Sequence, residues 1–600
     1  MEEKKKYKEP AKELDVYGEF DVVVVGGGCA GFPAAIAAAR NGAKTLIIER
    51  FPFFGGTATA SLMANIVGFR NQVEPDYLQT TKGIGEELIL RLLEIGGAVK
   101  SRNAYPSVQR SDKKGDLSYN YAFDTEKFKY VALKMVKESG AHILFHTYFS
   151  DVIFDSDHLL KGIIIENKSG RQAVFAKIII DATGDGNVAF KAGVPYWQTK
   201  KDEAKRLNDG LMYKIAGFPS ETKAPGCLIN QHMVVWGPSP GPINAADADE
   251  LTSAEIETRL RVFEDLEEKK KRWPEDLKGA YVVDTGSLLG IRQTRFFYGE
   301  YMLTGEDVLE GRRFWDSIAV AANPVISYFG YRRFLTHEGY TIPYRAILPK
   351  KIDNMYVVGR CMSSDQIAFE SWRAMAHIMA VGQAAGVAAA LCIEDKVLPK
   401  KIDVRKLQER LIEQGCEIGQ GFRKKGDSQM QDSSETLATG EAADAVHRVV
   451  YREMKAGEEW QVYNMVMRCF LEFIAPGYSR EGIDNFARYV NPELLLRRTQ
   501  NGNFVFVAVV DDEIIGTVEV SGNNHIALLF VKKEYHRKGI GKALLNMAIE
   551  ECKRRNPAVK IVNLNASPYA VKIYERLGFR KIQEEQVKDG IRFTPMEKEV

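Results

Sequence analysis

At 600 residues the chain is too long for a single hydrophobic core, and several structural units are expected. Its 82 Lys and Arg residues nearly balance its 80 Asp and Glu residues, so the charge gives no reason to expect a nucleic acid or an anionic membrane as partner. The seven cysteines form no CxxC pair and no Cys/His cluster. They are expected to be free thiols of a cytoplasmic protein, and no metal site is predicted.

The N-terminal part of the chain predicts a βαβ unit. Residues 1–18 are expected to form a polar tail, because they are charged and lack the apolar core of a signal peptide. The apolar run at 20–25 is typical of a buried parallel strand. A glycine-rich turn and an alanine-rich helix follow, and residues 43–49 then form a second strand.

The turn in this unit carries a dinucleotide-binding pattern. Gly26, Gly28 and Gly31 fill GxGxxG between a strand and a helix, which is the context that the motif requires. The first glycine permits a tight turn, the second lets backbone approach a pyrophosphate, and the third lets the helix pack closely. Glu49 follows the second strand, where its carboxylate can accept ribose hydroxyls, and Arg50 is included in the predicted site. The motif alone leaves FAD and NAD open.

The middle of the chain changes character twice. Short strands and turns over 141–181 indicate a β-meander that returns to the parallel sheet. The region 195–345 is expected to be an inserted, mixed domain on the substrate side, with charged helices near 253–271 and 305–322. Residues 354–360 then resemble another buried strand.

A small-residue helix is expected over 374–393. Its length and apolar character would pass a test for a membrane span, and Gly382 and Gly386 form GxxxG. It also contains His377 and Gln383, and it is rich in Ala and Gly rather than in Leu and Ile. We therefore predict a helix buried against a sheet and no membrane span.

A polar stretch at 416–445, rich in Gly and Ser, predicts a linker between an N-terminal domain at 19–415 and a C-terminal domain at 446–600. Beyond it a new pattern begins, with strands expected at 447–453, 503–510, 513–520, 525–531 and 559–564 and helices at 457–473, 540–554 and 568–576.

Five motifs in order over 20–395 resemble the FAD-dependent oxidoreductases related to the fumarate reductase flavoprotein class. After the glycine turn they are GGTAT (55–59), IIIDATGDG (178–186), IPYRAILPK with NMYVVGRCMSS (342–364), and GQAAG (382–386). The resemblance implies FAD, and it implies that the helix at 382–386 begins beside the flavin. The implied FAD contacts are Gly56, Thr57, Asp181, Gly184, Gly359, Gln383 and Ala384. Non-covalent FAD is expected, because residues 55–60 contain no histidine.

The same resemblance implies arginine as an anion fork or proton donor. Arg345 and Arg360 are the preferred catalytic candidates because they lie inside the motifs, and the others are Arg292, Arg295, Arg373, His337 and Tyr340. No second GxGxxG follows a strand. Hydride is therefore expected to pass directly between a small-molecule substrate and the flavin, or electrons to come from or go to a partner protein.

In the second module, the strand at 525–531 leads through a turn containing Gly539 and Gly541 into a helix. Backbone N–H groups there can surround a pyrophosphate, and Arg537, Lys538 and Lys542 add positive charge. The segment resembles the acyl-CoA loop of the GNAT acetyltransferase superfamily, with His536 where Gln or Arg is usual.

The resemblance covers about 447–600 and implies acetyl-CoA as cosubstrate. It places Phe530 and Val531 beside the pantetheine arm and gives Tyr574 the role of protonating the leaving thiolate. For the general base the sequence offers Glu519 and His525 as candidates.

We therefore expect an α/β protein: a Rossmann-like FAD-binding domain with an inserted α+β substrate domain, followed by a GNAT-like α+β domain. The predicted function is that of a bifunctional enzyme, an FAD-dependent oxidoreductase and an N-acetyltransferase. Two alternatives stay open. In one, the C-terminal domain senses acyl-CoA and regulates the flavoenzyme, and in the other, the flavin domain only transfers electrons. The sequence does not set the oligomeric state.

Overall fold

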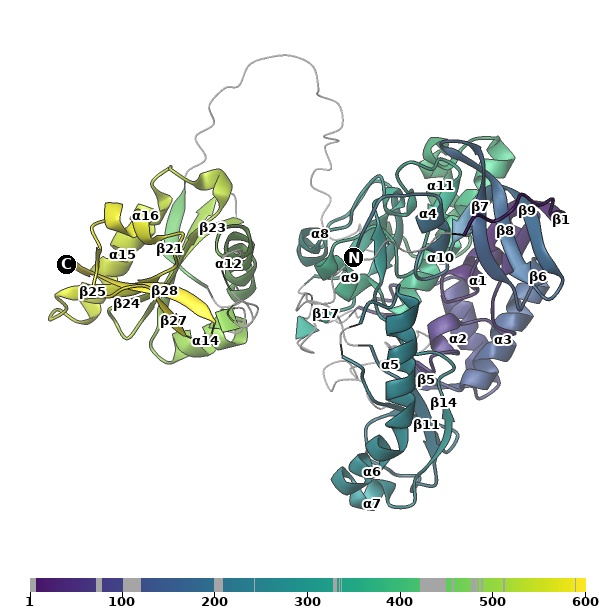
Figure 1. The fold of residues 1–600 in the computed structure, drawn as a ribbon, viewed down its shortest axis with the longest axis horizontal. Coiled ribbons are helices and arrows are strands. Elements are labelled where there is room, and N and C mark those ends of the chain that lie inside the picture. Colours follow the sequence, from purple (N-terminus) through teal and green to yellow (C-terminus); the bar gives the residue numbers. More distant parts are fainter. Residues whose placement is uncertain are drawn as a thin grey trace, which may run out of the picture. The chain divides into compact units, whose positions relative to one another are not determined.

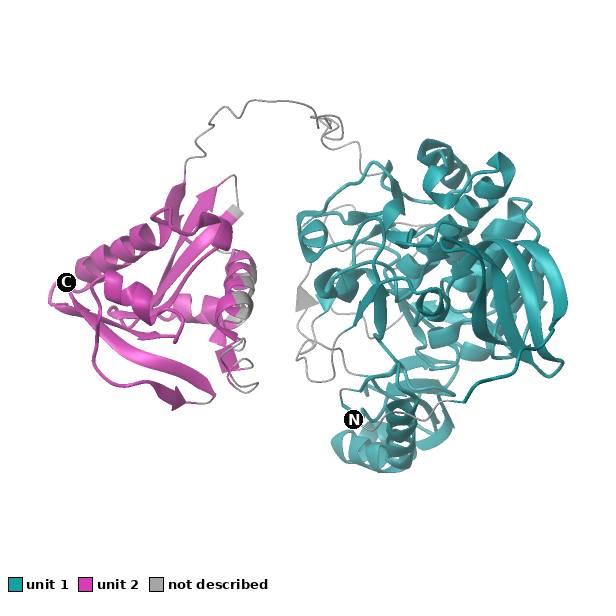
Figure 2. Cartoon of the chain, turned by 45° about the horizontal axis from the view of Figure 1, so that its top comes forward, with its two compact units in different colours: residues 1–430 teal, residues 431–600 magenta. Residues whose placement is uncertain are grey.

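The chain forms two compact units in a computed structural model, residues 1–430 and 431–600, and each is described by itself (Figure 2). The boundary falls within the predicted linker, of which residues 421–445 lie outside the described part. Residues 416–418, predicted as linker, are instead buried in the first unit, where the Ser317 hydroxyl donates to the Ile418 carbonyl at 2.5 Å. The residues that the structure describes are 7–71, 78–100, 120–198, 209–241, 243–326, 332–333, 335, 337–420, 449–455, 458–475, 478, 482, 485–486, 489–490, 492–510, 513–588 and 590–600.

The first unit is built on a sheet with a parallel centre (Figure 1). β1 (Asp15–Val25) lies between β2 (Thr45–Ile48) and β9 (Gly170–Asp181), and all three run parallel. β6 (His142–Leu144) extends the sheet beyond β2, and β20 (Met355–Val357) pairs with the end of β9. The predicted polar tail therefore ends earlier than expected, because residues 15–18 pair with the long strand β9.

The two faces of this sheet are covered differently. Val22 and Val24 of β1 pack in the core with α1 (Gly31–Arg40), α3 (Thr125–Glu138) and α10 (Met375–Asp395). Val23 and Val25 face a second core that includes β7 (Tyr148–Ser156) and β8 (Leu159–Asn167). Those two strands and β9 form the predicted β-meander. Burial of both faces explains why β1 is apolar without alternation over residues 22–25.

Helices α1 and α10 pack so closely that two glycines are required. A Cβ on Gly382 would lie 2.1 Å from the carbonyl oxygen of Ala30, and one on Gly386 would lie 2.2 Å from that of Ala34. The paired positions advance together along both chains, so the two helices run parallel. α10 is long and apolar enough to span a membrane, but 89% of its most apolar stretch is buried inside the protein, as predicted.

The inserted region has a core of its own. Its sheet has the order β12 (Cys227–Ile229), β13 (His232–Trp236), β11 (Met212–Ala216) and β14 (Tyr281–Thr285). The predicted charged helix near 253–271 is present as three pieces: α5 (Ala248–Leu260), α6 (Val262–Arg272) and α7 (Pro274–Leu277).

The predicted helix at 305–322 is wrong. α8 (Gly305–Glu310) stops at Gly311, which has a left-handed backbone (φ 69°). The fully buried run β16 (Ser317–Ala321) then pairs with β19 (Tyr340–Pro343), so burial between layers decides the strand. The other elements of the first unit are β3 (Asn65–Val67), α2 (Ile84–Glu94), β4 (Ala98–Lys100), β5 (Asn120–Phe123), α4 (Asn187–Lys191), β10 (Tyr196–Gln198), β15 (Arg295–Phe297), β17 (Val325–Ile326), β18 (Arg332–Arg333), α9 (Gln366–Trp372) and α11 (Val404–Glu413).

The second unit is a twisted sheet between two helical layers. α12 (Glu459–Phe473) and α14 (Pro492–Gln500) belong to one core, and α15 (Ile540–Arg555) and α16 (Val571–Arg576) belong to the other. Most predicted elements are present, but α14, β26 and β27 were missed. The strands in spatial order are β21 (Val450–Glu453), β22 (Phe504–Val510), β23 (Glu513–Ser521), β24 (His525–Val531), β25 (Ile561–Ala566), β28 (Ile591–Glu599) and β26 (Arg580–Lys581), with β27 (Gln586–Lys588) pairing with β28.

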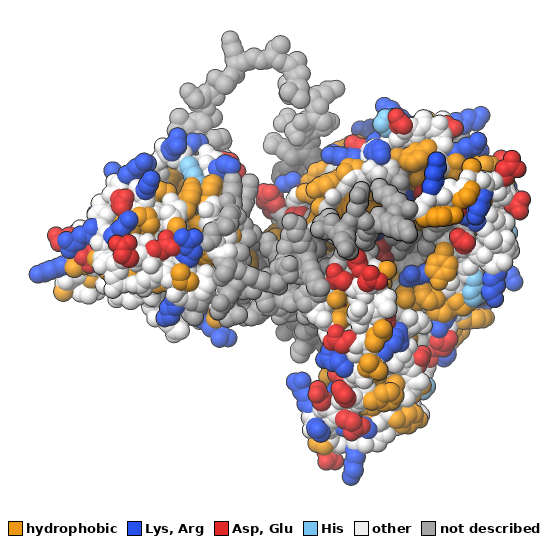
Figure 3. All heavy atoms as spheres, in the orientation of Figure 1, with side chains coloured by type: hydrophobic (Ala, Val, Ile, Leu, Met, Phe, Trp, Pro, Cys, Tyr) orange, Lys and Arg blue, Asp and Glu red, His pale blue; other side chains and the backbone are white. Residues whose placement is uncertain are grey.

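The surface and the thiols agree with the composition. On the face drawn in Figure 3, basic and acidic side chains alternate over both units without a patch of one sign. All seven cysteines are buried and unbridged. Burial raises the pKa of the Cys29 thiol to about 12, so the cysteine inside the glycine turn is a thiol rather than a thiolate.

Candidate functional sites

The glycine turn between β1 and α1 has the geometry that the motif predicts. Gly26 has φ 98°, a left-handed backbone, and a Cβ on Gly31 would lie 1.7 Å from the Gly26 carbonyl oxygen. At Gly28, by contrast, a Cβ would meet only one atom within 4 Å, the Gly56 Cα at 3.9 Å. The turn is therefore tightly packed at its two ends and open at Gly28. α1 begins there with no capping side chain and no acidic residue in its first turn, so no carboxylate of that turn opposes an anion at the positive end of the helix dipole.

Glu49 is fixed beside this turn. Its carboxylate accepts hydrogen bonds from the Gly27 N–H at 2.6 Å and the Phe51 N–H at 3.0 Å, and only 8% of the residue is exposed. Burial raises the pKa of Glu49, and the two N–H donors partly offset that effect. The carboxylate is thus held where a ribose on the turn would meet it. Arg50 is exposed and lies over the Phe51 ring at 5.1 Å.

Three further loops meet the glycine turn. Gly55 donates its N–H to the Gly27 carbonyl at 2.9 Å, and a Cβ on Gly56 would lie 3.0 Å from the Gly28 Cα. The half-buried Thr57 continues this loop. After β20, a Cβ on Gly359 would contact the Ala30 side chain at 3.6 Å. These loops follow the carboxyl ends of β2, β9 and β20, which is the edge where open parallel sheets bind ligands.

The loop after β9 corrects one predicted contact. Asp181 is fully buried, and its carboxylate accepts bonds from the Thr183 N–H and hydroxyl and from the Ala189 N–H. Its side chain therefore shapes the loop from inside instead of reaching a cofactor. The backbone of Gly184 (φ 79°) stays at the surface of the loop, where a Cβ would lie 3.0 Å from the guanidinium of Arg360.

Arg360 lies over this loop, and one of its two terminal guanidinium nitrogens has no hydrogen-bond partner among the described residues. Its Nη2 pairs with Asp185 at 3.0 Å. Its Nη1 is buried and has no hydrogen-bond partner in the part of the chain that the structure describes. A buried guanidinium nitrogen without an acceptor is costly, so it marks a place where a ligand oxygen would be stabilised.

The helix at 382–386 is placed differently from the prediction. Residues 382–386 lie in the middle of α10, which begins at Met375, because the small residues before Gly382 continue the helix. The Gln383 side chain accepts the Ile84 N–H at 2.8 Å, and Ala384 is fully buried. Both predicted flavin contacts are therefore packing residues between helices.

The true N-terminus of α10 projects beyond the glycine turn. Gly382 packs on Ala30 and the helices are parallel, so the seven residues from Met375 to Val381 carry α10 about 10 Å past the start of α1. Ala374, the N-cap residue, provides no side-chain cap, and the first turn has no acidic residue. α10 thus presents a second uncapped helix N-terminus in the first unit.

Unpartnered polar groups lie in and just before this first turn. The Nε1 atom of Trp372 is buried without a hydrogen bond among the described residues. The Nδ1 and Nε2 atoms of His377 are also buried and make no hydrogen bond of normal geometry there, although backbone groups of Trp372 and Gly68 lie near the ring. Burial lowers the pKa of His377 to about 4, against a smaller opposing effect of backbone groups at Trp372 and Gly68. The imidazole is therefore neutral at pH 7 and can donate one hydrogen bond. Sequence analysis missed both residues, and the available signal was an isolated histidine at the start of a small-residue helix.

Arg345, a preferred catalytic candidate, is engaged in an ion pair. Its Nε lies 2.8 Å from the carboxylate of Asp316, which is fully buried, and its Nη2 lies 3.2 Å from the same group. The pair raises the pKa of Arg345. The structure therefore gives Arg345 a structural role.

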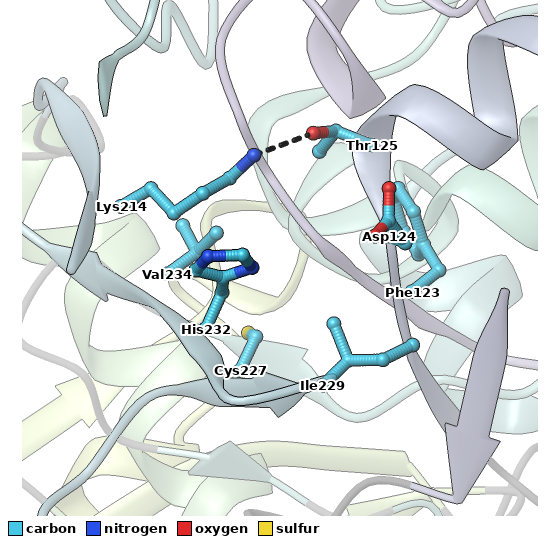
Figure 4. Close-up of a pocket in the computed structure, with 8 residues that line it drawn as sticks. All are labelled: Phe123, Asp124, Thr125, Lys214, Cys227, Ile229, His232 and Val234. Atoms are coloured by element: carbon cyan, nitrogen blue, oxygen red, sulfur yellow. Dashed lines mark hydrogen bonds between the residues drawn. The ribbon is translucent and has the colours of Figure 1, made fainter. Parts of the chain in front are cut away.

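Other candidates are also bonded internally. His337 contacts the Gly339 and Val308 carbonyls, Tyr340 donates to Ser371, and Arg295 lies 4.1 Å over the ring of Phe190. Elsewhere in this unit, a hollow beside Lys214 and Thr125 measures only about 10 Å³ (Figure 4). That volume holds no more than a water molecule.

The second unit contains a large cleft of about 810 Å³. β24 and β25 are paired only at His525–Asn563 and Ile526–Leu564, so their carboxyl ends separate and leave one edge of β24 open. The register between β23 and β24 shifts between Glu519 and Val520, which bulges β24 near Ala527. Ala527 and Phe530 both line the cleft.

The loop from His536 to Gly541 fits a pyrophosphate. Gly539 has φ 83° and a Cβ there would meet nothing within 4 Å, so the space beside it is open. Arg537 is also left-handed, with φ 61°. α15 begins after Gly539 without a capping side chain or an acidic residue, and Arg537 and Lys542 are exposed beside it. Backbone N–H groups thus converge with positive charge at a helix N-terminus.

His536 and Val531 differ from the prediction. The Nε2 of His536 bonds to the Val531 carbonyl at 2.9 Å, and its ring lies 5.3 Å from that of Phe473. A carbonyl only accepts, so this nitrogen carries the proton. His536 holds the end of β24 in place, and the Val531 carbonyl is already occupied.

Tyr574 and His525 line the cleft, and Glu519 is not among its lining residues. Tyr574 is 9% exposed, and burial raises its pKa, so it stays protonated as a thiolate's proton donor must. Glu519 is fully buried, with its carboxylate bonded to Arg498 at 2.7 and 3.0 Å and to Asn503 at 2.8 Å. Of the two candidates for the general base, His525 therefore faces the cleft and Glu519 does not.

The parallel sheet and its open glycine turn define the first unit as a dinucleotide-binding α/β fold, and the separated strands and phosphate loop define the second as an acyl-CoA-binding α+β fold. The family described as FAD dependent oxidoreductase matches residues 21–224 and 197–411, and the chain belongs to this family. The family described as Acetyltransferase (GNAT) domain matches residues 474–600. The protein is an enzyme, and FAD is its cofactor.

Individual relatives cover parts of the chain. The digeranylgeranylglycerophospholipid reductase of Methanocaldococcus jannaschii is 31% identical over 30% of this chain, which spans 41% of that protein's length. A solved geranylgeranyl bacteriochlorophyll reductase-like protein of Thermoplasma acidophilum is 15% identical over 67% of this chain and 84% of its own (TM-score 0.37). The PaiA N-acetyltransferase of the same organism, solved with coenzyme A, is 23% identical over 26% of this chain and 99% of its own (TM-score 0.23).

Proposed function

We propose that the protein is a bifunctional enzyme: an FAD-dependent oxidoreductase acting on a small molecule, and an acetyl-CoA-dependent N-acetyltransferase. The observation that carries the proposal is that each unit has an open, uncapped helix N-terminus beside a glycine turn, one after β1 and one after β24. Each can bind a pyrophosphate independently of the other.

When bound, FAD supplies a two-electron carrier for hydride transfer. The residues of the chain supply the rest. The glycine turn and the positive end of α1 bind the pyrophosphate, and Glu49 accepts the ribose hydroxyls. The buried Nη1 of Arg360 and Nε1 of Trp372 have no partner among the described residues, and these donors orient an oxygen-bearing substrate or the flavin's polar edge.

In the second unit, the open edge of β24 binds the pantetheine arm and the bulge near Ala527 re-aims backbone N–H groups toward the thioester. An amine attacks the acetyl carbonyl, a C–N bond forms and the C–S bond breaks. Tyr574 gives its proton to the departing thiolate. The presence of a proton donor inside the cleft favours catalysis over a sensor role.

The test uses the purified full chain. A yellow protein that releases FAD on denaturation, and whose dithionite-reduced flavin is reoxidised by a small-molecule extract, supports the first activity. Release of CoA thiol from acetyl-CoA in the presence of an amine panel supports the second. Acetyl-CoA binding without turnover, together with altered flavin reduction rates, would favour the regulatory alternative. Reoxidation only by a protein fraction would favour electron transfer.

Metabolite profiling with and without the chain then tests whether the two activities are consecutive. A product that is both acetylated and changed in oxidation state supports coupling, and separate products refute it.

A further inference from the structure

We infer that His525, oriented by Asn563, is the base that takes the proton from the acceptor amine in the second unit. The inference rests on the proposed acetyltransferase function and names a catalytic residue for it.

The first step is the tautomer of His525. Its Nδ1 makes a short hydrogen bond with the Oδ1 of Asn563, which lies directly opposite it in the parallel register of β24 and β25. An amide oxygen only accepts, so Nδ1 carries the proton and Nε2 has the lone pair. Backbone pairing holds both residues, because Asn563 also donates its N–H to the Asn524 carbonyl at 2.9 Å.

The second step is access. His525 is half-buried and lines the cleft, two residues before the bulge at Ala527. It lies at the closed end of the gap between β24 and β25, where the strands last pair. A thioester bound along the open edge of β24 points its acetyl group toward this end. The lone pair of Nε2 is thus available on the side from which an amine arrives.

The third step excludes the alternative. Glu519 of β23 is the other candidate base, and its carboxylate accepts two hydrogen bonds from Arg498 and one from Asn503. Its carboxylate is neutralised by an ion pair and does not line the cleft. The carboxylate of Glu597, which lies opposite Asn563 on β28, is paired with Arg580.

The proton balance defines the role. An alkylamine arrives as an ammonium ion, and Nε2 accepts one proton so that the nitrogen can attack. The C–N bond forms, the C–S bond breaks, and Tyr574 protonates the sulfur. The second proton of the attacking nitrogen, lost as the amide forms, returns Tyr574 to its neutral form. The products are the amide and CoA, with one proton left on His525 for release to water. Asn563 is a positioning residue that fixes the ring.

The experiment compares two acceptors of similar shape on the full chain, benzylamine and O-benzylhydroxylamine. The first is protonated at neutral pH, and the second is not. His525→Gln is expected to lower the benzylamine rate by about 10²-fold or more, and the O-benzylhydroxylamine rate by much less. Asn563→Leu should likewise lower the benzylamine rate more than the O-benzylhydroxylamine rate. Asn563→Asp should keep the wild-type ratio of the two rates, since a carboxylate also accepts the Nδ1 proton. The acetyl-CoA Kd should not change.

Equal losses with both acceptors, or an altered acetyl-CoA Kd, would give His525 a structural role and overturn the inference. An unchanged benzylamine rate would also overturn it while leaving the acetyltransferase function intact. If the wild-type chain binds acetyl-CoA but acetylates neither probe, both the function and the base assignment are rejected.

Discussion

Replacing Gly382 by alanine should separate α10 from α1 and weaken FAD binding. The added Cβ would lie 2.1 Å from the Ala30 carbonyl oxygen, and real Cβ contacts are essentially never under 3.0 Å. The helices must therefore move apart by about 1 Å, and the opposing atoms are backbone, which cannot rotate away. Overpacking of this kind costs about 1–3 kcal/mol, and the better helix propensity of alanine returns about 1 kcal/mol. We expect a net loss of up to about 2 kcal/mol.

The assay is thermal release of FAD, followed by flavin fluorescence, because it reports the first unit alone. Ala30 belongs to the glycine turn, so FAD affinity should fall together with the midpoint. Gly85→Ala is the matched control: it is also helical, but its Cβ would meet only side-chain atoms, the nearest at 3.2 Å. If Gly382→Ala and Gly85→Ala have the same midpoint and FAD affinity as the wild type, the inferred close approach of α10 and α1 is wrong.

Three further predictions follow from the structure. The neutral, buried His377 has a pKa of about 4 instead of 6.5, so the unfolded state binds more protons between these values. As the pH drops through this window, the free energy of unfolding should therefore fall by about 3 kcal/mol more in the wild type than in His377→Leu. Denaturation of the first unit at several pH values measures it, and the same pH dependence in both proteins would contradict it. Gly539→Ala should weaken acetyl-CoA binding about tenfold or more, measured by calorimetry. Gly578→Ala, at a glycine with a similar left-handed backbone (φ 89°), should lower stability but leave the Kd unchanged. Equal Kd values for the two variants would refute the phosphate-binding role of the loop before α15. Arg345→Ala should lower the stability of the first unit by about 1–3 kcal/mol without changing the flavin spectrum, because it leaves the buried carboxylate of Asp316 without its partner. Adding Asp316→Asn to this variant should recover part of the loss, because the buried charge is then gone. Lost turnover at unchanged stability would instead show that Arg345 is catalytic.

The features that the sequence predicted well are local. The three glycines of the turn, Glu49 after β2, and the loop before α15 are defined by spacing between adjacent elements. Steric and electrostatic requirements in such a short segment are visible in the residues themselves. The buried helix over 374–393 was also predictable, because its small residues suit close packing more than lipid.

The predictions that failed depended on partners far away in the chain. Arg345 meets Asp316, and Gln383 meets the N-terminus of α2, contacts that no local pattern announces. The helix expected over 305–322 became β16 because a buried strand, β19, lies beside it. Local propensity was outweighed by burial.

By itself, the sequence predicted two folding units and the positions of the two glycine turns, because those turns are built from consecutive residues. The cofactor type of each unit came from its resemblance to a family. Only the tertiary structure decided which side chains remain for chemistry. It gave Asp181, Arg345 and His536 internal partners. It left Nη1 of Arg360 and Nε1 of Trp372 without a partner among the described residues, and it left His525 and Tyr574 facing the cleft. A polar group is available to a ligand only if the folded chain has not already satisfied it, and that is a property of long-range contacts.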